Sequence, residues 1–412
     1  MRKMKLSTTR KWAMIAMLTF FGGCIYKVTY LREVFYSQVI EALRISHTQL
    51  GLLSSAVGIA SMAGYFFGGF LADRFSSKKM VMTACFGSGL LTLWYMTFPP
   101  FPVLMFIHGA IALCGTLIFW AAYIRIVRLL GGSEGQGKYY GFSEGIRSLF
   151  GIILPFGATA LIEHLVNAES GVRGVLMYYA LCYFLSGFLA MFLIVDIREE
   201  REASGRVDLR QYKKLFMTPG LWLVALLIFG TYAVFALQSY TTPYMTEICG
   251  LPETLVSSVA IFRQYGLGLI AMPIFGILAD YVKSAVKTCI IGLLLLLLSA
   301  AGLLWCPGAN RIFVIILVLA VGFLVSGVRG VYYAAQDEAR IPKSLSGTAA
   351  GIISALGFSP DAFMFIQVGG WLDKYPAARA YKMIWVYMMI TSAAAIAAAV
   401  GILIAANHAR HR

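Results

Sequence analysis

The chain is 412 residues long, and 59% of its residues are hydrophobic while only 13% are charged. A soluble domain carries roughly a quarter charged residues, so this chain has too little charge to cover a surface that faces water. Apolar runs of about 20 residues recur from end to end, and each is long enough to cross the hydrocarbon core of a bilayer. The composition excludes a soluble protein and predicts an all-α membrane protein.

Reading the apolar runs between charged or Pro/Gly breaks predicts twelve spans in two sets of six. The first set lies near 12–36, 48–72, 80–98, 103–129, 139–164 and 174–196. The second set lies near 219–246, 255–279, 286–305, 312–335, 345–368 and 383–406. A strongly charged stretch separates the two sets. We therefore expect an N-terminal six-helix bundle at 1–197, a cytoplasmic linker at 198–216 and a C-terminal six-helix bundle at 217–412.

The start of the chain, residues 1–26, loosely resembles a lipoprotein leader that ends near Cys24. Because its apolar run reads as the first of many spans, we expect it to stay on the protein. The seven cysteines stand singly, without CxxC spacing or a histidine cluster, so we expect no metal and no cofactor. Single buried thiols are the preferred interpretation, and a bridge between Cys249 and Cys306 is the alternative.

Orientation follows from lysine and arginine, which are enriched in cytoplasmic loops. With the N-terminus inside, most of the 34 Lys and Arg fall in cytoplasmic segments, including the Lys78–Lys79 pair and the linker. Both termini are therefore expected in the cytoplasm. The net charge of +15 is in this interpretation a topology signal, and we expect no nucleic acid as a partner.

One loop occurs twice, once in each half of the chain. Spans 2 and 3 are joined by GFLADRFSSKK (69–79), and spans 8 and 9 by GILADYVK (276–283). Repetition half a chain apart predicts two pseudo-symmetric halves. Small residues allow helix ends to approach closely, an aspartate can accept bonds from a neighbouring helix N-terminus, and basic residues anchor the loop at the membrane surface. The residues of this gating-loop motif are Gly69, Asp73, Arg74, Lys78, Gly276, Asp280 and Lys283.

These residues resemble the signature loop G-x-x-x-D-R/K-x-G-R/K-R/K of the major facilitator superfamily, and the resemblance covers the whole chain through span count, repeat and linker position. Ser76 stands where the family has its second glycine, and Tyr281 replaces the basic residue of the second copy. Residues 119–147 and 327–361 also resemble the branch that groups organophosphate antiporters with nitrate/nitrite-porter-like permeases. The resemblance implies a secondary transporter that alternates between inward-open and outward-open states, with spans 1, 4, 7 and 10 lining a central cavity.

Charged residues inside the spans carry the functional argument, because a charge there costs roughly 2.5–3.5 kcal/mol on insertion scales. Cations outnumber acids, so we expect a positive cavity and an anionic substrate. The fork of an arginine suits carboxylate, phosphate or sulfonate oxygens. The interior cations are Lys27, Arg32, Arg125, Arg147, Arg263 and Arg329, and the acids at comparable depth are Glu144 and Asp361.

Helical spacing sorts the charges of the first span. Tyr26, Tyr30 and Glu33 fall on one face, and Lys27 lies at the border of that face. Arg32 is about 140° round the helix from Lys27. We therefore expect Lys27 to face the cavity, Tyr30 to line it, and Arg32 to snorkel outward.

Two charge pairs are candidates for coupling. Arg263 and Asp361 lie at similar depth in spans 8 and 11, and their pair is either an ion-coupled switch or a static salt bridge. Nearer the cytoplasm, Glu144 is the candidate partner of Arg125, as packing or as an inner gate. The other candidate cavity and coupling residues are Tyr123, Arg147, Gln264, Arg329 and Tyr333.

The sequence contains no Walker loop, no HExxH and no GxSxG, so we do not expect an enzyme. We expect a monomeric secondary transporter of a small organic anion in the cell inner membrane. Its partners would be that anion, a co-transported proton or counter-substrate, and the lipid bilayer. The alternative is a membrane receptor that binds such a solute without transporting it. An exporter of lipids or drugs would need an acidic cavity, which the basic interior argues against.

Overall fold

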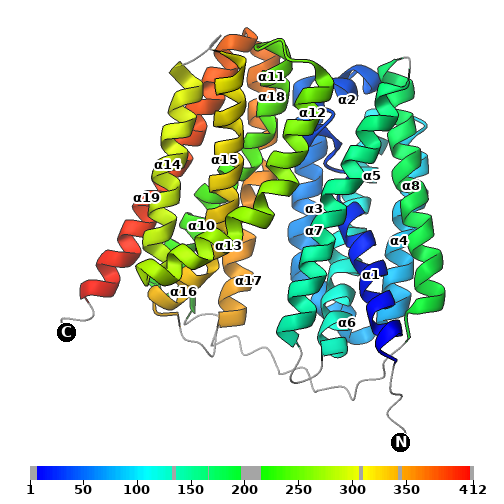
Figure 1. Cartoon of the computed structure of the whole chain (residues 1–412), viewed down its shortest axis with the longest axis horizontal. Helices are drawn as coiled ribbons and strands as arrows, with labels where there is room; N and C mark the ends of the chain where they lie inside the picture. The colour runs from blue at the N-terminus through cyan, green and yellow to red at the C-terminus, as the bar shows by residue number, and fades with distance from the viewer. Residues whose placement is uncertain are drawn as a thin grey trace, which may run out of the picture. The chain divides into compact units, whose positions relative to one another are not determined.

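The computed structural model describes residues 7–131, 136–165, 167–195, 215–305, 310–341 and 346–408 (Figure 1). Every regular element in these ranges is a helix or a helical turn, so the predicted all-α class is confirmed. The first half contains α1 (Thr8–Cys24), η1 (Leu31–Glu33), α2 (Tyr36–Leu43), α3 (His47–Arg74), α4 (Ser77–Tyr95), α5 (Phe101–Leu113), η2 (Cys114–Trp120), α6 (Ala121–Gly131), α7 (Gln136–Glu163) and α8 (Ala168–Leu193).

The second half begins after the strongly charged stretch. It contains α10 (Pro219–Leu237), η3 (Gln238–Tyr240), α11 (Thr241–Glu247), α12 (Glu253–Ile261), η4 (Phe262–Gly266), α13 (Leu267–Val282), α14 (Ala285–Trp305), α15 (Arg311–Val331), η5 (Tyr332–Ala334), α16 (Ala335–Glu338), α17 (Ser346–Gly357), η7 (Ser359–Ala362), α18 (Met364–Lys374) and α19 (Ala377–His408). The expected linker falls almost entirely outside the described residues, so its bounds stay a prediction.

Nine helical stretches in the described ranges are long and apolar enough to cross a membrane. They match expected spans 4 to 12, from Phe101–Val127 to Ala377–Ala406. Expected spans 2 and 3 coincide with α3 and α4, and α1 covers only the first part of expected span 1. The predicted apolar runs are therefore helices, whereas the count of twelve crossings stays a prediction.

The chain divides into two units. Unit 1 consists of Met1–Leu31, Gln38–Arg44 and Ile59–Gly205. Unit 2 consists of Arg32–Ser37, Ile45–Gly58 and Arg206–Arg412. Two short segments of the first half of the chain thus belong to unit 2, and α3 contributes its first part to unit 2 and its second part to unit 1.

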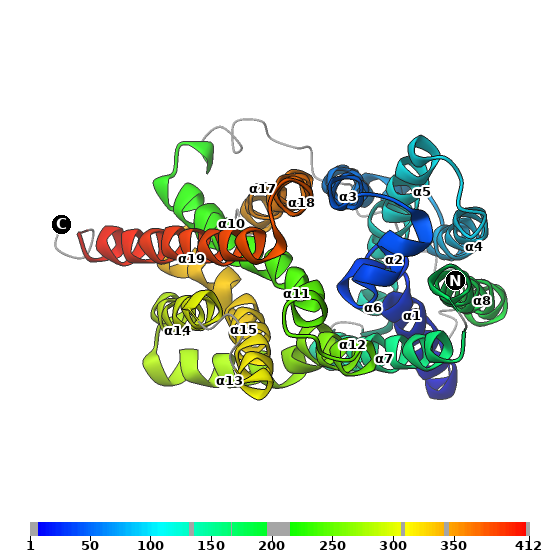
Figure 2. The ribbon, with the colours of Figure 1, turned by 90° about the horizontal axis from the view of Figure 1, so that it is seen from above.

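Within unit 1, α1 packs against α7 and α8, and α4 packs against α8 (Figure 2). Short polar side chains start these helices by accepting bonds from otherwise unpaired backbone N–H groups. The side chain of Ser76 accepts from Lys79 N at the start of α4. Asn167 and Ser170 form a reciprocal capping box at the start of α8.

Within unit 2, α19 packs against α10 and α14, and α15 packs against α13 and α14. Small residues allow these close approaches. A Cβ placed on Gly230 of α10 would lie 2.4 Å from the carbonyl oxygen of Thr391 in α19. The backbones of α10 and α19 therefore lie in close contact at this glycine.

The first expected span is not one continuous helix. α1 ends at Cys24, irregular turns follow at 25–30, and the 3-10 turn η1 precedes α2. The hydroxyl of Tyr183 lies 3.0 Å from the carbonyl oxygen of Cys24 and 3.1 Å from that of Ile25, so it supplies a side-chain donor at the end of α1, where the Cys24 carbonyl also accepts from Lys27 N at 2.9 Å. The helical spacing that related Lys27 to Glu33 therefore does not hold.

Two π-helical turns interrupt predicted spans. η2 lies in the fourth span and η4 in the eighth. Such turns add a residue to the helical repeat, and they occur frequently at functional sites. η4 contains Arg263, Gln264 and Tyr265, which places the candidate site of unit 2 on an irregular helix.

Candidate functional site

Lys27 is buried in unit 1, with 6% of its surface exposed. Its ammonium group donates to the carbonyl oxygen of Gly151 in α7, at 2.9 Å. In a regular helix that carbonyl would accept from the N–H four residues later, but Pro155 stands there and has no N–H. The lysine therefore satisfies a backbone acceptor that the proline leaves open, which is a structural role that sequence spacing did not reveal.

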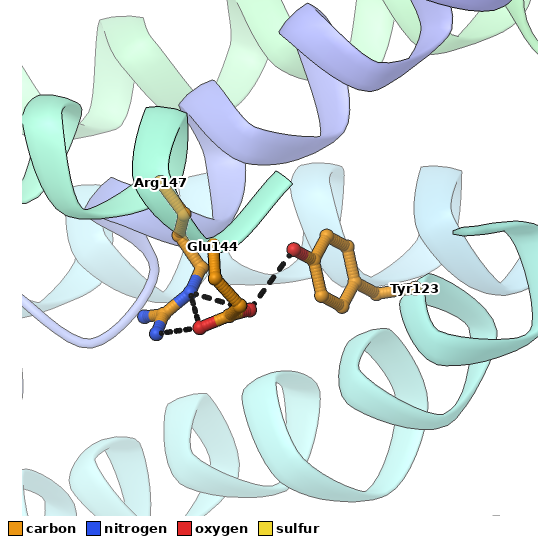
Figure 3. A network of polar contacts seen from close by, with 3 residues as sticks. All are labelled: Tyr123, Glu144 and Arg147. Atoms are coloured by element: carbon orange, nitrogen blue, oxygen red, sulfur yellow. Dashed lines mark hydrogen bonds and ion pairs between the residues drawn. The ribbon is translucent and has the colours of Figure 1, made fainter. Parts of the chain in front are cut away.

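Tyr123, Glu144 and Arg147 form a polar network on α6 and α7 (Figure 3). The Glu144 carboxylate accepts from the Arg147 guanidinium at 2.5 Å and from the Tyr123 hydroxyl at 3.1 Å. The ring of Trp120 lies 5.8 Å from the guanidinium carbon. Glu144 was expected to neutralise Arg125, and the structure gives it Arg147 and Tyr123 as partners. Arg125 and Tyr30, also in unit 1, are half-buried.

Arg263 is fully enclosed in unit 2, with 0% of its surface exposed. Its Nη1 donates to the hydroxyls of Thr241 and Thr242, the latter at 3.3 Å. Its Nε and Nη2 have no hydrogen-bond partner among the described residues. A Cβ on Gly322 would lie 2.5 Å from Arg263 Cγ, so this glycine gives the side chain room against α15.

Arg32 is buried, with 3% of its surface exposed, so the expectation that it snorkels outward is wrong. Its guanidinium carbon lies 3.5 Å from the centre of the Phe365 ring and 5.8 Å from that of Tyr240. Its Nε and Nη2 also lack partners among the described residues. The prediction failed because it assumed a helix through residues 25–30, where the chain turns.

Glu33 is buried beside these arginines, with 6% of its surface exposed. Its carboxylate accepts from the Tyr265 hydroxyl at 3.0 Å, and its backbone carbonyl accepts from the Thr242 hydroxyl at 2.9 Å. Glu33 and Arg32 are both close enough to Arg263 to interact with it electrostatically. Unit 2 thus gathers two cations and one acid among hydroxyl groups.

Asp361 is buried and accepts from the Tyr232 hydroxyl at 2.7 Å. A Cβ on Gly58 would lie 2.7 Å from Asp361 Cβ, so α3 approaches this residue closely. Because Arg263 donates to threonine hydroxyls and Asp361 accepts from a tyrosine, each group has its own hydroxyl partner. The structure does not bring them together as the pair that sequence depth suggested.

The remaining candidates of unit 2 occupy separate places. The Arg329 guanidinium carbon lies 3.7 Å from the centre of the Phe235 ring, and its Nε has no partner among the described residues. The Tyr333 hydroxyl lies 2.5 Å from Ser354 Oγ. Gln264 accepts from Gln238 Nε2 at 3.1 Å.

In the first copy of the repeated loop, Gly69 and Asp73 lie on α3, but their side chains lie outside the described part of the structure. Arg74, the last residue of α3, is exposed. The ammonium group of Lys78 donates to the carbonyl oxygen of Met191 at 2.6 Å. A lysine of this loop thus binds the end of α8.

The second copy ends α13 and starts α14. Gly276 has open space around its Cα and Asp280 is exposed. Lys283 ends α13 in the left-handed conformation, with φ of 55°. Glu338 then accepts from Ser284 Oγ at 2.7 Å and from Val286 N at 3.0 Å, which caps the start of α14. Sequence reasoning had expected an aspartate of the loop in such a role and missed Glu338.

Sequence reasoning also missed the residues that complete the unit 2 cluster. Thr241, Thr242 and Tyr240 are ordinary polar and aromatic residues inside an apolar run, and no spacing marks them. Glu33 was visible as an acid but was placed near the end of a span. The available signal was the adjacent Arg32–Glu33 pair, since two neighbouring opposite charges in an apolar run need partners.

The family follows from a comparison of the sequence with family models. The model described as Major Facilitator Superfamily matches residues 15–363. The chain therefore belongs to the major facilitator superfamily, as the repeated loop indicated.

Two relatives from Escherichia coli (strain K12) match nearly end to end. Inner membrane protein YqcE is 31% identical over 395 residues, which are 94% of this chain and 93% of the relative. Inner membrane protein YihN is 27% identical and covers 92% of both chains.

Solved structures show the same fold at low identity. The D-xylose-proton symporter superposes with a TM-score of 0.77 at 15% identity, over 96% of this chain and 97% of the symporter. The nucleoside transporter NupG superposes with a TM-score of 0.76 at 11% identity, over 96% of this chain and 99% of that one. The family and the shared fold indicate a transporter rather than an enzyme.

Proposed function

We propose that the chain is a secondary transporter that carries a small organic anion across the inner membrane by alternating access, coupled to protons or to exchange of a counter-substrate. The family and the transporter fold support secondary transport. The names of the two Escherichia coli relatives support the inner membrane.

One observation favours an anion. In unit 2, Arg32 and Arg263 bury guanidinium nitrogens that have no acceptor among the described residues, and Arg329 buries its Nε in the same state. A buried donor without a partner costs about 1–3 kcal/mol, and more when it is charged. The oxygens of a bound anion supply the missing acceptors. These buried, positively charged donors without acceptors are the reason why we propose an anion and not a neutral solute as the substrate.

Transport by purified protein in proteoliposomes tests this proposal. Arg263→Ala, Arg329→Ala and Lys27→Ala should each abolish uptake of the anion while the protein still inserts and folds. Arg379→Ala, which removes an exposed arginine that packs on Tyr375, should transport normally. Unchanged uptake in all three interior variants would overturn the proposal. Binding without flux in the unaltered protein would favour the receptor alternative.

Proton coupling is assigned in this proposal to Asp361 or Glu144, because both are carboxylates held by tyrosine hydroxyls. Each carries a carboxyl group that can bind and release a proton, which coupling to a pH gradient requires. In proteoliposomes, Asp361→Asn and Glu144→Gln are tested for accumulation of the anion driven by a pH gradient. Exchange of internal for external anion, which needs no pH gradient, is the control. Accumulation that survives both substitutions would exclude these residues as the coupling sites.

The proposal includes twelve spans in two pseudo-symmetric six-helix bundles, a monomeric state and both termini in the cytoplasm. Terminal tags test the orientation. Both should be cut by protease in inside-out vesicles and protected in right-side-out vesicles. A single protected terminus in inside-out vesicles would require an odd number of spans.

A further inference from the structure

Two arginines of unit 2, Arg32 and Arg263, share an unusual state. Each is more than nine-tenths buried, and in each both Nε and Nη2 lack a hydrogen-bond partner among the described residues. Arg32 lies on the rings of Phe365 and Tyr240, and Arg263 donates to threonine hydroxyls. Four donor nitrogens are therefore available within one cluster.

Contacts along three short segments make the cluster continuous. Arg32 is followed by Glu33, whose carbonyl accepts from Thr242. The same threonine hydroxyl accepts from Arg263. Tyr265, two residues beyond Arg263, donates to the Glu33 carboxylate. The two arginines thus belong to one site, although they come from opposite halves of the chain.

The charge of the cluster can be counted. Arg32 and Arg263 contribute two positive charges and Glu33 one negative charge, which leaves a net charge of +1. Among the described residues, Tyr36, Tyr240 and Tyr265 are further ionisable groups in its surroundings, and His47 Nδ1 lies 2.9 Å from the Tyr36 hydroxyl. Glu247 and Asp373 interact with Tyr36, but both acids are exposed, so water screens them and they do not neutralise the buried arginines.

Net charge decides which ligand the cluster accepts. A singly charged oxyanion brings the site to neutrality. A doubly charged oxyanion leaves one buried negative charge without a partner, and such a charge is costly in a low-dielectric interior.

We propose that Arg32 and Arg263 form an oxyanion subsite in which Glu33 sets the valence, so that the subsite takes a singly charged sulfonate or carboxylate group and disfavours a dianionic phosphate monoester. This inference rests on the proposed transport of an anion. The nitrogens are closed to water in this conformation, so the anion reaches them when the transport cycle opens the cluster.

Propyl phosphate and propanesulfonate are the probes. The phosphate ester passes from one negative charge to two around pH 6, whereas the sulfonate carries one charge throughout. Binding to the purified full-length chain is measured by titration calorimetry from pH 5 to pH 8. In the unaltered protein, the affinity for propyl phosphate should fall about tenfold or more as the pH rises. The affinity for propanesulfonate should stay constant, which controls for titration of the protein itself.

Substitutions show which residues cause this pH dependence of the affinity. In Glu33→Gln the cluster carries a net charge of +2, so the fall in affinity for propyl phosphate with rising pH should vanish or reverse. Glu247→Gln removes an exposed acid of the same neighbourhood and should behave like the unaltered protein. Arg32→Gln should weaken both probes at least tenfold, with unliganded melting curves to show that the variant is folded. Butyrate replaces propanesulfonate in a parallel series to separate carboxylate from sulfonate.

The outcomes separate the two proposals. A preference for the dianion in the unaltered protein, or a Glu33→Gln variant that keeps the unaltered pH dependence, overturns the role of Glu33. Anion transport that persists unchanged in Arg32→Gln overturns the subsite and leaves anion transport standing. Failure of the unaltered protein both to bind and to transport any of the probes counts against both proposals.

Discussion

At the scale of single residues, Lys27 and Pro155 act on the same atom. Pro155 removes the N–H that would bind the Gly151 carbonyl within α7, and the ammonium group of Lys27 replaces it at 2.9 Å. The lysine charge is in turn stabilised by the dipole of this helix carbonyl. A stability role and a transport role can therefore be tested separately at this residue.

We predict that Lys27→Met lowers the free energy of unfolding by about 1–3 kcal/mol, because it leaves a buried carbonyl without a donor. In a Pro155→Ala background the helix regains the N–H, so the same substitution should cost much less. Thermal unfolding in detergent of the four proteins of this cycle measures the coupling. An equal cost in both backgrounds would show that the lysine does not act through this carbonyl.

The buried charges show which features of the site could be predicted from the sequence. Counting charges inside apolar runs found Lys27, Arg263 and Arg329, because a buried charge is visible without any geometry. The outward placement of Arg32 was wrong, and Asp361 accepts from Tyr232 where sequence depth had suggested Arg263. Those assignments needed the helical phase, which the turns at 25–30 and the π-helical turn η4 change.

At the scale of elements, the first part of α3 and α18 are held together by glycines within unit 2. A Cβ on Gly51 would lie 2.2 Å from the carbonyl oxygen of Phe365, and one on Gly369 would lie 2.4 Å from that of His47. The Asp373 carboxylate at the end of α18 accepts from His47 N at 3.0 Å and from Thr48 N at 2.8 Å. Both contacts require the two backbones to lie close together.

We predict that Gly51→Ala and Gly369→Ala each destabilise the protein by about 1–3 kcal/mol, since the added methyl group meets backbone that cannot move aside locally. Gly351→Ala is the matched control, because nothing lies within 4 Å of its Cβ position. That control should be neutral or stabilising by up to about 1 kcal/mol, as alanine is the better helix former. Thermal unfolding measures all three, and equal melting temperatures would contradict the close packing.

Elements were predictable to different degrees. The expected spans coincide largely with helix, because about 20 apolar residues in lipid must satisfy their own backbone, but the first span is helical only as far as Cys24. The breaks were not predictable. α1 ends at Cys24, and no Gly or Pro follows directly to mark the boundary. Gly22 and Gly23 lie inside the helix and do not end it. The Tyr183 hydroxyl that supplies a donor at its end comes from a distant part of the chain.

At the scale of the molecule, sequence repetition and contact units divide the chain differently. The repeated loop predicts two halves of equal length, whereas unit 2 also takes segments Arg32–Ser37 and Ile45–Gly58 from the first half. Repetition reports the ancestry of the halves, and contacts report one conformation. In the proposed alternating cycle, we infer that the contacts of these two segments within unit 2 break when the other state forms.

We predict that a cross-link between residues 47 and 373 stops transport. The carboxylate of Asp373 caps α3 at its first residues, and in the proposed cycle this part of α3 must leave α18 for the other state to form. The double variant His47→Cys/Asp373→Cys is made in a background without the native cysteines, and an oxidant joins the two new thiols in a disulfide. The oxidised protein should lose uptake in proteoliposomes and regain it on reduction.

A second cysteine pair controls for the chemistry. Ser284 and Glu338 are in contact within unit 2, 2.7 Å apart, and both lie in the second half of the chain. Joining them should leave uptake intact, because no step of the cycle separates them. Full uptake with the first pair joined would mean that α3 stays on α18 throughout transport. The segments that unit 2 takes from the first half would then be permanent parts of it, and alternation would have to occur elsewhere in the molecule.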